Sequence, residues 1–305
     1  MIPRRLLPPA LLLPFLLTGC LEFGTQTMSY RYNKATDTLQ IFQDYHGIFG
    51  ADAKGQPDTG LSQDEQQQLE SVLKGQRTFF FNNWIFEFNR AQVESQLEDL
   101  KQPDKRAELK MPDAGLASLE KLLRLLKENV RVENGPFYFD AEKKLSGVQY
   151  VTVSHCSAVI VAANDFAPYF IKSQAEDDKA SQEDKAVARK FADHPLPVVQ
   201  LEGNALTIQW PAPRAGYEAA FGASSNDAAK LAEARKAGLG IAWTNDLVTL
   251  KLGGVTNAVT RLTLTFSENR YSTNLVEPAR KQHTVRDAFD VKAAEENFLA
   301  RGRRD

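Results

Sequence analysis

Asp44 and His46 are the residues whose types and spacing could best support chemistry. They lie two positions apart in a segment with the pattern of a β-strand, so both side chains should point to the same face. A carboxylate placed there can orient an imidazole, an arrangement used in acid–base catalysis and in metal binding. Either role needs further converging side chains, and a polar pair on a strand surface is the ordinary interpretation. The pair is therefore a candidate site that still lacks a third member.

His155 and Cys156 are adjacent and could suggest a thiol nucleophile with its base. Neighbouring side chains diverge by about 100° on a helix and face opposite sides of a strand, which disfavours direct pairing. Apolar residues follow Cys156, as is typical of a free cysteine in a core. The other histidines are His194 and His283, and a metal site would need several histidines or carboxylates to converge.

The sequence motifs of common enzyme classes are missing from the chain. It contains no Gly-x-Ser-x-Gly, His-Glu-x-x-His, Gly-x-x-x-x-Gly-Lys-Ser/Thr or Cys-x-x-Cys. The loop 50–60 has acidic residues but lacks the alternating ligands of a calcium site, and Lys54 would repel the ion. From the sequence we assign no catalytic residue, no metal ligand and no cofactor.

Residues 1–20 have the layout of a secretory signal. Arg4 and Arg5 give a basic start, an apolar stretch covers 6–17, and small residues precede Cys20. The apolar stretch is shorter than the roughly 20 residues that a membrane-spanning helix needs. We interpret 1–19 as a signal peptide that is removed on export.

The run Leu17-Thr18-Gly19-Cys20 resembles the lipobox of bacterial lipoproteins. This resemblance covers residues 1–20 and implies that Cys20 receives a diacylglycerol and becomes the first residue of the mature protein. Leu21 follows the cysteine, and in Gram-negative relatives this resembles the pattern that is sorted to the outer membrane. Each buried methylene contributes about 0.8 kcal/mol, so two or three acyl chains would hold the protein on a membrane. The resemblance predicts a protein of the cell envelope whose first partner is the membrane.

Composition is that of a folded protein without an excess of positive charge. The chain is 43% hydrophobic and 25% charged, and its 18 phenylalanines can bury a large apolar area. Its formal net charge of −2 gives no indication of nucleic-acid binding, which usually requires a basic face or helix. We expect no nucleic-acid partner.

The elements that would position these residues mix strands and helices without regular alternation. Aromatic and alternating runs on either side of 33–38 predict a hairpin, and similar runs predict strands over 130–139 and 145–153. Helical spacing predicts a helix capped by Asp113 and another that starts near Cys156. This order indicates an α+β fold of mainly antiparallel sheets built from hairpins, with several amphipathic helices. Further predicted elements are helices that begin at Ser62, Asp227 and Thr284, a hairpin over 79–88, and strands over 196–201, 205–210, 239–243, 248–252 and 259–266.

A chain of 305 residues fits one large domain or two ordinary ones. The stretch 174–193 is rich in charged and polar residues, so it is the candidate boundary. After the signal peptide we expect a lipidated N-terminus with a short tether over 20–27, an α+β lobe over 28–173, a charged helix or connector over 174–193, and a second α+β lobe or a continuation of one domain over 194–305.

Predicted localisation to the cell envelope, together with the lack of a catalytic motif, favours a non-catalytic binding or scaffold module. An envelope protein is a possible partner. The alternative is an exported, hydrolase-like enzyme whose site is assembled from residues remote in sequence. Convergence of Asp44, His46 or His155 with further acids would favour the enzyme. A protein that docks another envelope protein would instead show a contiguous exposed apolar patch.

Overall fold

The computed structural model describes most of the folded body. The described residues are 20–51, 90–175, 181–193, 195–221, 232, 238–254, 259–265, 276, 280 and 285–301. The expected helix from Ser62, the hairpin over 79–88 and nearly all of the helix from Asp227 lie outside them.

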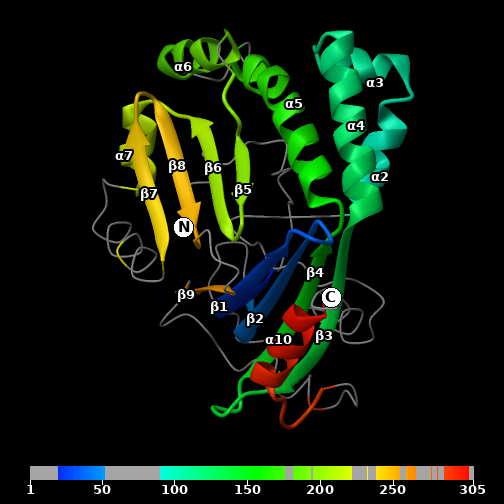
Figure 1. Ribbon diagram of the computed structural model, residues 1–305, viewed down its shortest axis with the longest axis vertical. Helices are drawn as coiled ribbons and strands as arrows, with labels where there is room; N and C mark the ends of the chain where they lie inside the picture. Colours follow the sequence, from blue (N-terminus) through cyan, green and yellow to red (C-terminus); the bar gives the residue numbers. More distant parts are fainter. Residues whose placement is uncertain are drawn as a thin grey trace.

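A five-stranded antiparallel sheet, here called sheet A, forms the centre of the molecule (Figure 1). Its strand order is β3-β4-β2-β1-β9, so the first strand of the chain lies between the second strand and the ninth. The β1–β2 hairpin keeps one register from Cys20↔Ala51 to Asn33↔Thr38. The strands are β1 (Cys20–Asn33), β2 (Thr38–Ala51), β3 (Val130–Phe139), β4 (Leu145–Val153) and β9 (Thr260–Thr265).

A four-stranded antiparallel sheet, sheet B, follows the central helices in sequence. Its order is β5-β6-β8-β7. Apolar residues alternate with polar ones along β8, where Val248, Leu250 and Leu252 are buried. This alternation gives sheet B one apolar face toward the core. The strands are β5 (Val199–Glu202), β6 (Ala205–Pro211), β7 (Leu239–Thr244) and β8 (Leu247–Leu252).

Helices α2, α4, α5 and α6 pack in succession, whereas α10 lies against β2 and β1. In Figure 1 the long helix α5 runs between sheet B and α4, with α2 and α3 on the far side of α4. The edge strand β5 is held against α5 by Asn164, whose side chain makes two hydrogen bonds with the backbone of Val199, at 2.8 and 2.9 Å. The helices are α2 (Arg90–Asp99), α3 (Pro103–Glu108), α4 (Asp113–Asn129), α5 (Cys156–Ala175), α6 (Gln182–Asp193), α7 (Arg214–Phe221) and α10 (Val291–Ala300).

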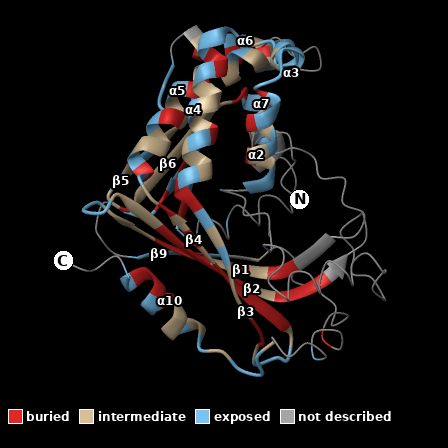
Figure 2. Ribbon diagram, turned by 90° about the vertical axis from the view of Figure 1, so that its right-hand side faces the viewer, coloured by how far each residue is buried: buried red, intermediate tan, exposed pale blue. Residues whose placement is uncertain are grey.

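One hydrophobic core joins the two sheets. Ile41 of sheet A and Leu250 of sheet B belong to the same buried cluster, together with Leu116 and Leu123 of α4. Figure 2 shows that buried residues follow the strands of sheet A and the inner faces of the helices. The predicted α+β class with antiparallel sheets is confirmed.

A turn of sheet B fastens the two sheets together. Asn204 in the β5–β6 turn accepts hydrogen bonds from the hydroxyl of Tyr30, at its carbonyl oxygen, and from the backbone N–H of Tyr32, at Oδ1, over 2.8 and 2.6 Å. Gly253 lies beside this joint at φ +69°, and a Cβ atom there would come within 2.4 Å of the Asn204 carbonyl. The joint requires a glycine for both reasons.

Several predicted boundaries differ from the structure. Residues 20–27 form the first half of β1 instead of a tether, because the 14-residue β2 offers them partners along its whole length. The C-terminal helix begins at Val291 rather than Thr284, since Asp290 supplies the N-cap through a 2.9 Å bond from the N–H of Ala293. Pro112 rather than Asp113 precedes the first turn of α4.

The segment 174–193, expected as a charged helix or a connector, contains a helix. The charged segment 182–193 is helix α6, which packs against α5. Strand β9 belongs to sheet A although it comes from the C-terminal third, and α10 lies against β2 and β1. The segment 194–305 therefore contributes strands to both sheets.

Candidate functional site

Asp44 and His46 lie side by side on one face of β2. Nε2 of His46 is 2.8 Å from Oδ2 of Asp44. The carboxylate is nearly enclosed, with 5% of its side chain exposed, whereas 37% of the imidazole is exposed. The strand therefore holds a buried acid behind a histidine that reaches solvent.

Tyr138 of β3 is the third member of this polar site. Its hydroxyl donates a 2.8 Å hydrogen bond to Oδ1 of Asp44, so both carboxylate oxygens have a partner. A register shift between Asn134 and Phe137 places Tyr138 opposite Ser146 of β4. The sequence signal for this irregularity was Gly135-Pro136 inside an otherwise strand-like run. Sequence reasoning missed Tyr138 because strand pairing brings it to Asp44 from 94 residues away.

The β3–β4 turn brings the carboxylates of Asp140 and Glu142 close enough to act on the imidazole through their charge. Asp140 accepts bonds from the backbone N–H groups of Glu142 and Lys144, both at 2.9 Å, and from the Ser146 hydroxyl at 3.2 Å. Glu142 pairs with Lys144 at 2.5 Å. These contacts fix the conformation of the turn. Asp140 and Glu142 therefore affect His46 through their negative charge.

The electrostatic setting favours a protonated imidazole. Burial lowers the pKa of His46, but the hydrogen bond and negative charge of Asp44, aided by the charges of Asp140 and Glu142, outweigh burial and raise the pKa above its usual value. Burial raises the pKa of Tyr138, and the adjacent Asp44 carboxylate raises it further. Tyr138 therefore stays a neutral hydrogen-bond donor at physiological pH.

This arrangement can exchange a proton at His46 or bind a polar group there. Ser146 is not an activated nucleophile here, because it is fully buried and its hydroxyl is directed to Asp140. Among the residues that the structure describes, no three His, Cys, Asp or Glu side chains are placed to hold a metal ion. The geometry fits an oriented histidine better than a complete catalytic set.

His155 and Cys156 do not form a second catalytic pair. Cys156 is buried in the core, and burial together with the charge of Asp37 raises the pKa of its thiol to about 12. Such a thiol is a weak nucleophile. His155 is exposed at the turn before α5, with φ at 46°.

Asp37, in the β1–β2 turn, caps α5 from another element. Its Oδ1 accepts a 3.0 Å bond from the N–H of Ser157, its Oδ2 accepts a 2.6 Å bond from the Ser157 hydroxyl, and its carbonyl accepts one from the N–H of Cys156. Burial opposes its ionisation, but the bonds from Ser157 and Tyr32 dominate and lower the pKa of Asp37. The helix N-terminus thereby gains a negative charge.

Cys20 is the first residue of β1 and pairs with Ala51. His194 and His283 lie outside the described residues, as does nearly all of the loop 50–60. None of the helices in the described part of the chain is both long and apolar enough to span a bilayer.

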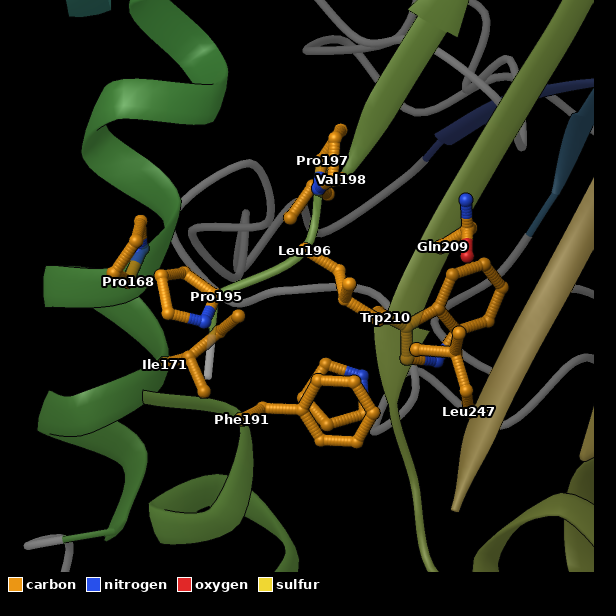
Figure 3. A pocket seen from close by; sticks show the side chains of 11 residues that line it. Pro168, Ile171, Phe191, Pro195, Leu196, Pro197, Val198, Gln209, Trp210 and Leu247 are labelled. Carbon is orange, nitrogen blue, oxygen red and sulfur yellow. The ribbon is translucent and has the colours of Figure 1, made fainter. Parts of the chain in front are cut away.

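A separate apolar recess lies between α5, α6 and sheet B (Figure 3). It is shallow and partly open to solvent, and no charged residue lines it. Leu196 on its rim is 49% exposed. Trp210 lines it as well, and the indole N–H of Trp210 is buried without an acceptor in the described structure. This is a small apolar surface with one unpaired donor.

The chain matches no protein-family model, and neither the curated proteins nor the solved structures contain a significant match to it.

Proposed function

We propose that this protein is a lipid-anchored component of the cell envelope that acts as a non-catalytic binding or scaffold module close to the membrane. The observation that carries the proposal is the run Leu17-Thr18-Gly19-Cys20 at the end of a signal-like segment. Outer-membrane sorting is part of the proposal for a Gram-negative source, because Leu21 follows the cysteine.

The architecture of the polar site supports the non-catalytic half of the proposal. Asp44 uses both oxygens to hold His46 and Tyr138 within sheet A, and the Ser146 hydroxyl is buried. A structural or ligand-binding role needs no activated nucleophile. A second envelope protein is the partner that a scaffold would require.

Mass spectrometry of the mature N-terminus tests the anchor. The wild-type chain should begin at Cys20 and carry acyl chains, whereas a Cys20→Ala variant should remain uncleaved and without lipid. A wild-type chain that retains residues 1–19 and has no lipid would contradict the proposal.

The second candidate function is an exported, hydrolase-like enzyme, and the hydrogen bond between Asp44 and His46 is the observation that favours it. Comparing wild type with His46→Gln on a panel of p-nitrophenyl esters separates the two functions. A binding module should give the same background rate for both chains. A rate that falls about 100-fold or more in the variant would support the enzyme instead.

A further inference from the structure

Strand β1 begins at Cys20, so no flexible segment separates the expected lipid from the folded body. Pairing with β2 begins at Cys20↔Ala51 and continues through Phe23↔Ile48. Phe23 is 6% exposed and Ile48 2% exposed, so the hairpin is packed into the protein from this pair onward. A residue held in a strand cannot act as a flexible linker.

The two ends of the β1–β2 hairpin carry different parts of the molecule. At the turn, Asp37 binds the N-terminus of α5, and Tyr32 binds Asn204 of sheet B. Toward the other end, the described pairing reaches Thr25 with β9 and Tyr45 with β4. The helices and sheet B are therefore fastened at the end opposite Cys20.

The length of β1 gives the separation between these ends. At about 3.3 Å per residue, Asn33 lies roughly 43 Å from Cys20 along the strand. His46 pairs with Thr25, only five positions from Cys20, or about 17 Å by the same spacing. The β3–β4 turn lies at this level too, because Gly147 pairs with Tyr45.

We infer that the bilayer is an oriented partner of this protein: sheet A meets the lipid surface at its Cys20 end, with the β3–β4 turn and His46 near the headgroups and the α5–sheet B end directed away. This inference rests on the proposed lipidation of Cys20. The β1–β2 hairpin then acts as a rigid support that fixes the height of each surface above the membrane.

Energy transfer to a headgroup-labelled lipid tests the orientation. Ala141 in the β3–β4 turn and Ala35 in the β1–β2 turn are both exposed, so each can be replaced by cysteine and labelled with the same fluorophore. Cys156 is buried and Cys20 would carry lipid, so labelling should be confined to the introduced thiol. The lipidated chain is reconstituted in vesicles of phosphatidylethanolamine and phosphatidylglycerol. Transfer should be severalfold more efficient from A141C than from A35C.

A flexible Gly–Ser insert between Cys20 and Leu21 is the matched control. It keeps the strand pairing from Leu21↔Gly50 onward and should abolish the difference between the two positions. Equal transfer from a lipidated chain without the insert would overturn the orientation, and so would a difference that survives the insert. A chain that mass spectrometry finds without lipid would instead overturn the proposed function, and the orientation with it.

Discussion

The hydroxyl group of Tyr30 donates a 2.8 Å hydrogen bond to the carbonyl oxygen of Asn204. This bond links β1 of sheet A to the β5–β6 turn of sheet B. Both groups are buried, and burial raises the pKa of Tyr30, which keeps the donor protonated. The two sheets thus share a fixed polar joint inside an apolar contact.

Asn204→Ala should destabilise the protein. The substitution removes Oδ1, which accepts the backbone N–H of Tyr32 at 2.6 Å, and leaves that donor unpaired at a cost of about 1–3 kcal/mol in free energy of unfolding. Tyr30→Phe should cost less, about 1 kcal/mol, because the Asn204 carbonyl loses one donor. Urea unfolding followed by circular dichroism measures both. Lys251→Ala on the exposed face of sheet B is the control, and an equal loss there would contradict the assignment.

Gly253→Ala should be more harmful than Gly254→Ala. A Cβ at Gly253 would approach the Asn204 carbonyl and the Thr260 hydroxyl at 2.4 Å each, and φ is +69°. The conformational penalty of about 1–2 kcal/mol adds to an overpacking cost of about 1–3 kcal/mol. A Cβ at Gly254 meets nothing within 4 Å. Thermal unfolding of the two variants should therefore differ clearly, and equal midpoints would show that the joint is loosely packed.

Asp37→Ala should weaken the attachment of the β1–β2 turn to α5. Loss of a helix cap costs about 0.5–2 kcal/mol, and alanine at φ 47° adds about 1 kcal/mol of strain. Asp37→Asn keeps an acceptor oxygen and tolerates that backbone conformation, so it should lose less. Amide hydrogen exchange in the first turn of α5 reports the local effect. Unchanged protection in both variants would rule out the cap as a stabilising contact.

The raised pKa of His46 predicts a pH-dependent stability with a definite sign. The attraction to Asp44 is fully present below the pKa of an unfolded histidine, about 6.5, and is lost as pH rises through the higher pKa of the folded state. Because the imidazole is 37% exposed, the change should stay below about 1 kcal/mol. His46→Gln, which does not titrate, should lack this component when unfolding is measured from about pH 6 to about pH 8. A wild-type stability that rises relative to the variant over this range would contradict the assignment.

Cys156 should resist thiol reagents until the protein unfolds. In a Cys20→Ala background it is the sole thiol, and its pKa of about 12 and its burial both slow modification. Reaction with a chromogenic disulfide at pH 8 should be slow in buffer and fast in urea. Ala35→Cys in the same background supplies an exposed thiol for comparison. Fast reaction of Cys156 in buffer would show that the N-terminal end of α5 opens readily.

Local patterns in the sequence were enough to predict the hairpin around 33–38 and the fold class. Asn33 illustrates why: its side chain accepts the N–H of Ala35 two residues later, a turn that depends on neighbours alone. Alternation along β2 likewise placed Asp44 and His46 on one face. These features need no information about distant segments.

The remaining features depend on contacts between segments far apart in the chain. Tyr138 reaches Asp44 only after a register shift in β3. Asp37 caps helix α5 through Ser157, which lies 120 residues later in the chain. The start of β1 at Cys20 depends on the presence of a long partner strand. Single-sequence periodicity cannot reveal such pairings, because many strands offer the same alternation.

The pairing of β1 with β9 sets an order on folding. Thr27 and Thr263, whose hydroxyl groups lie 3.0 Å apart across these strands, are separated by 236 residues. One edge of β1 consequently stays without its partner strand until nearly the whole chain is available. Contacts of such long range slow folding and leave an open strand edge that can aggregate. If the chain crosses a membrane unfolded and N-terminus first, the open edge of β1 would therefore need protection from aggregation until β9 has emerged.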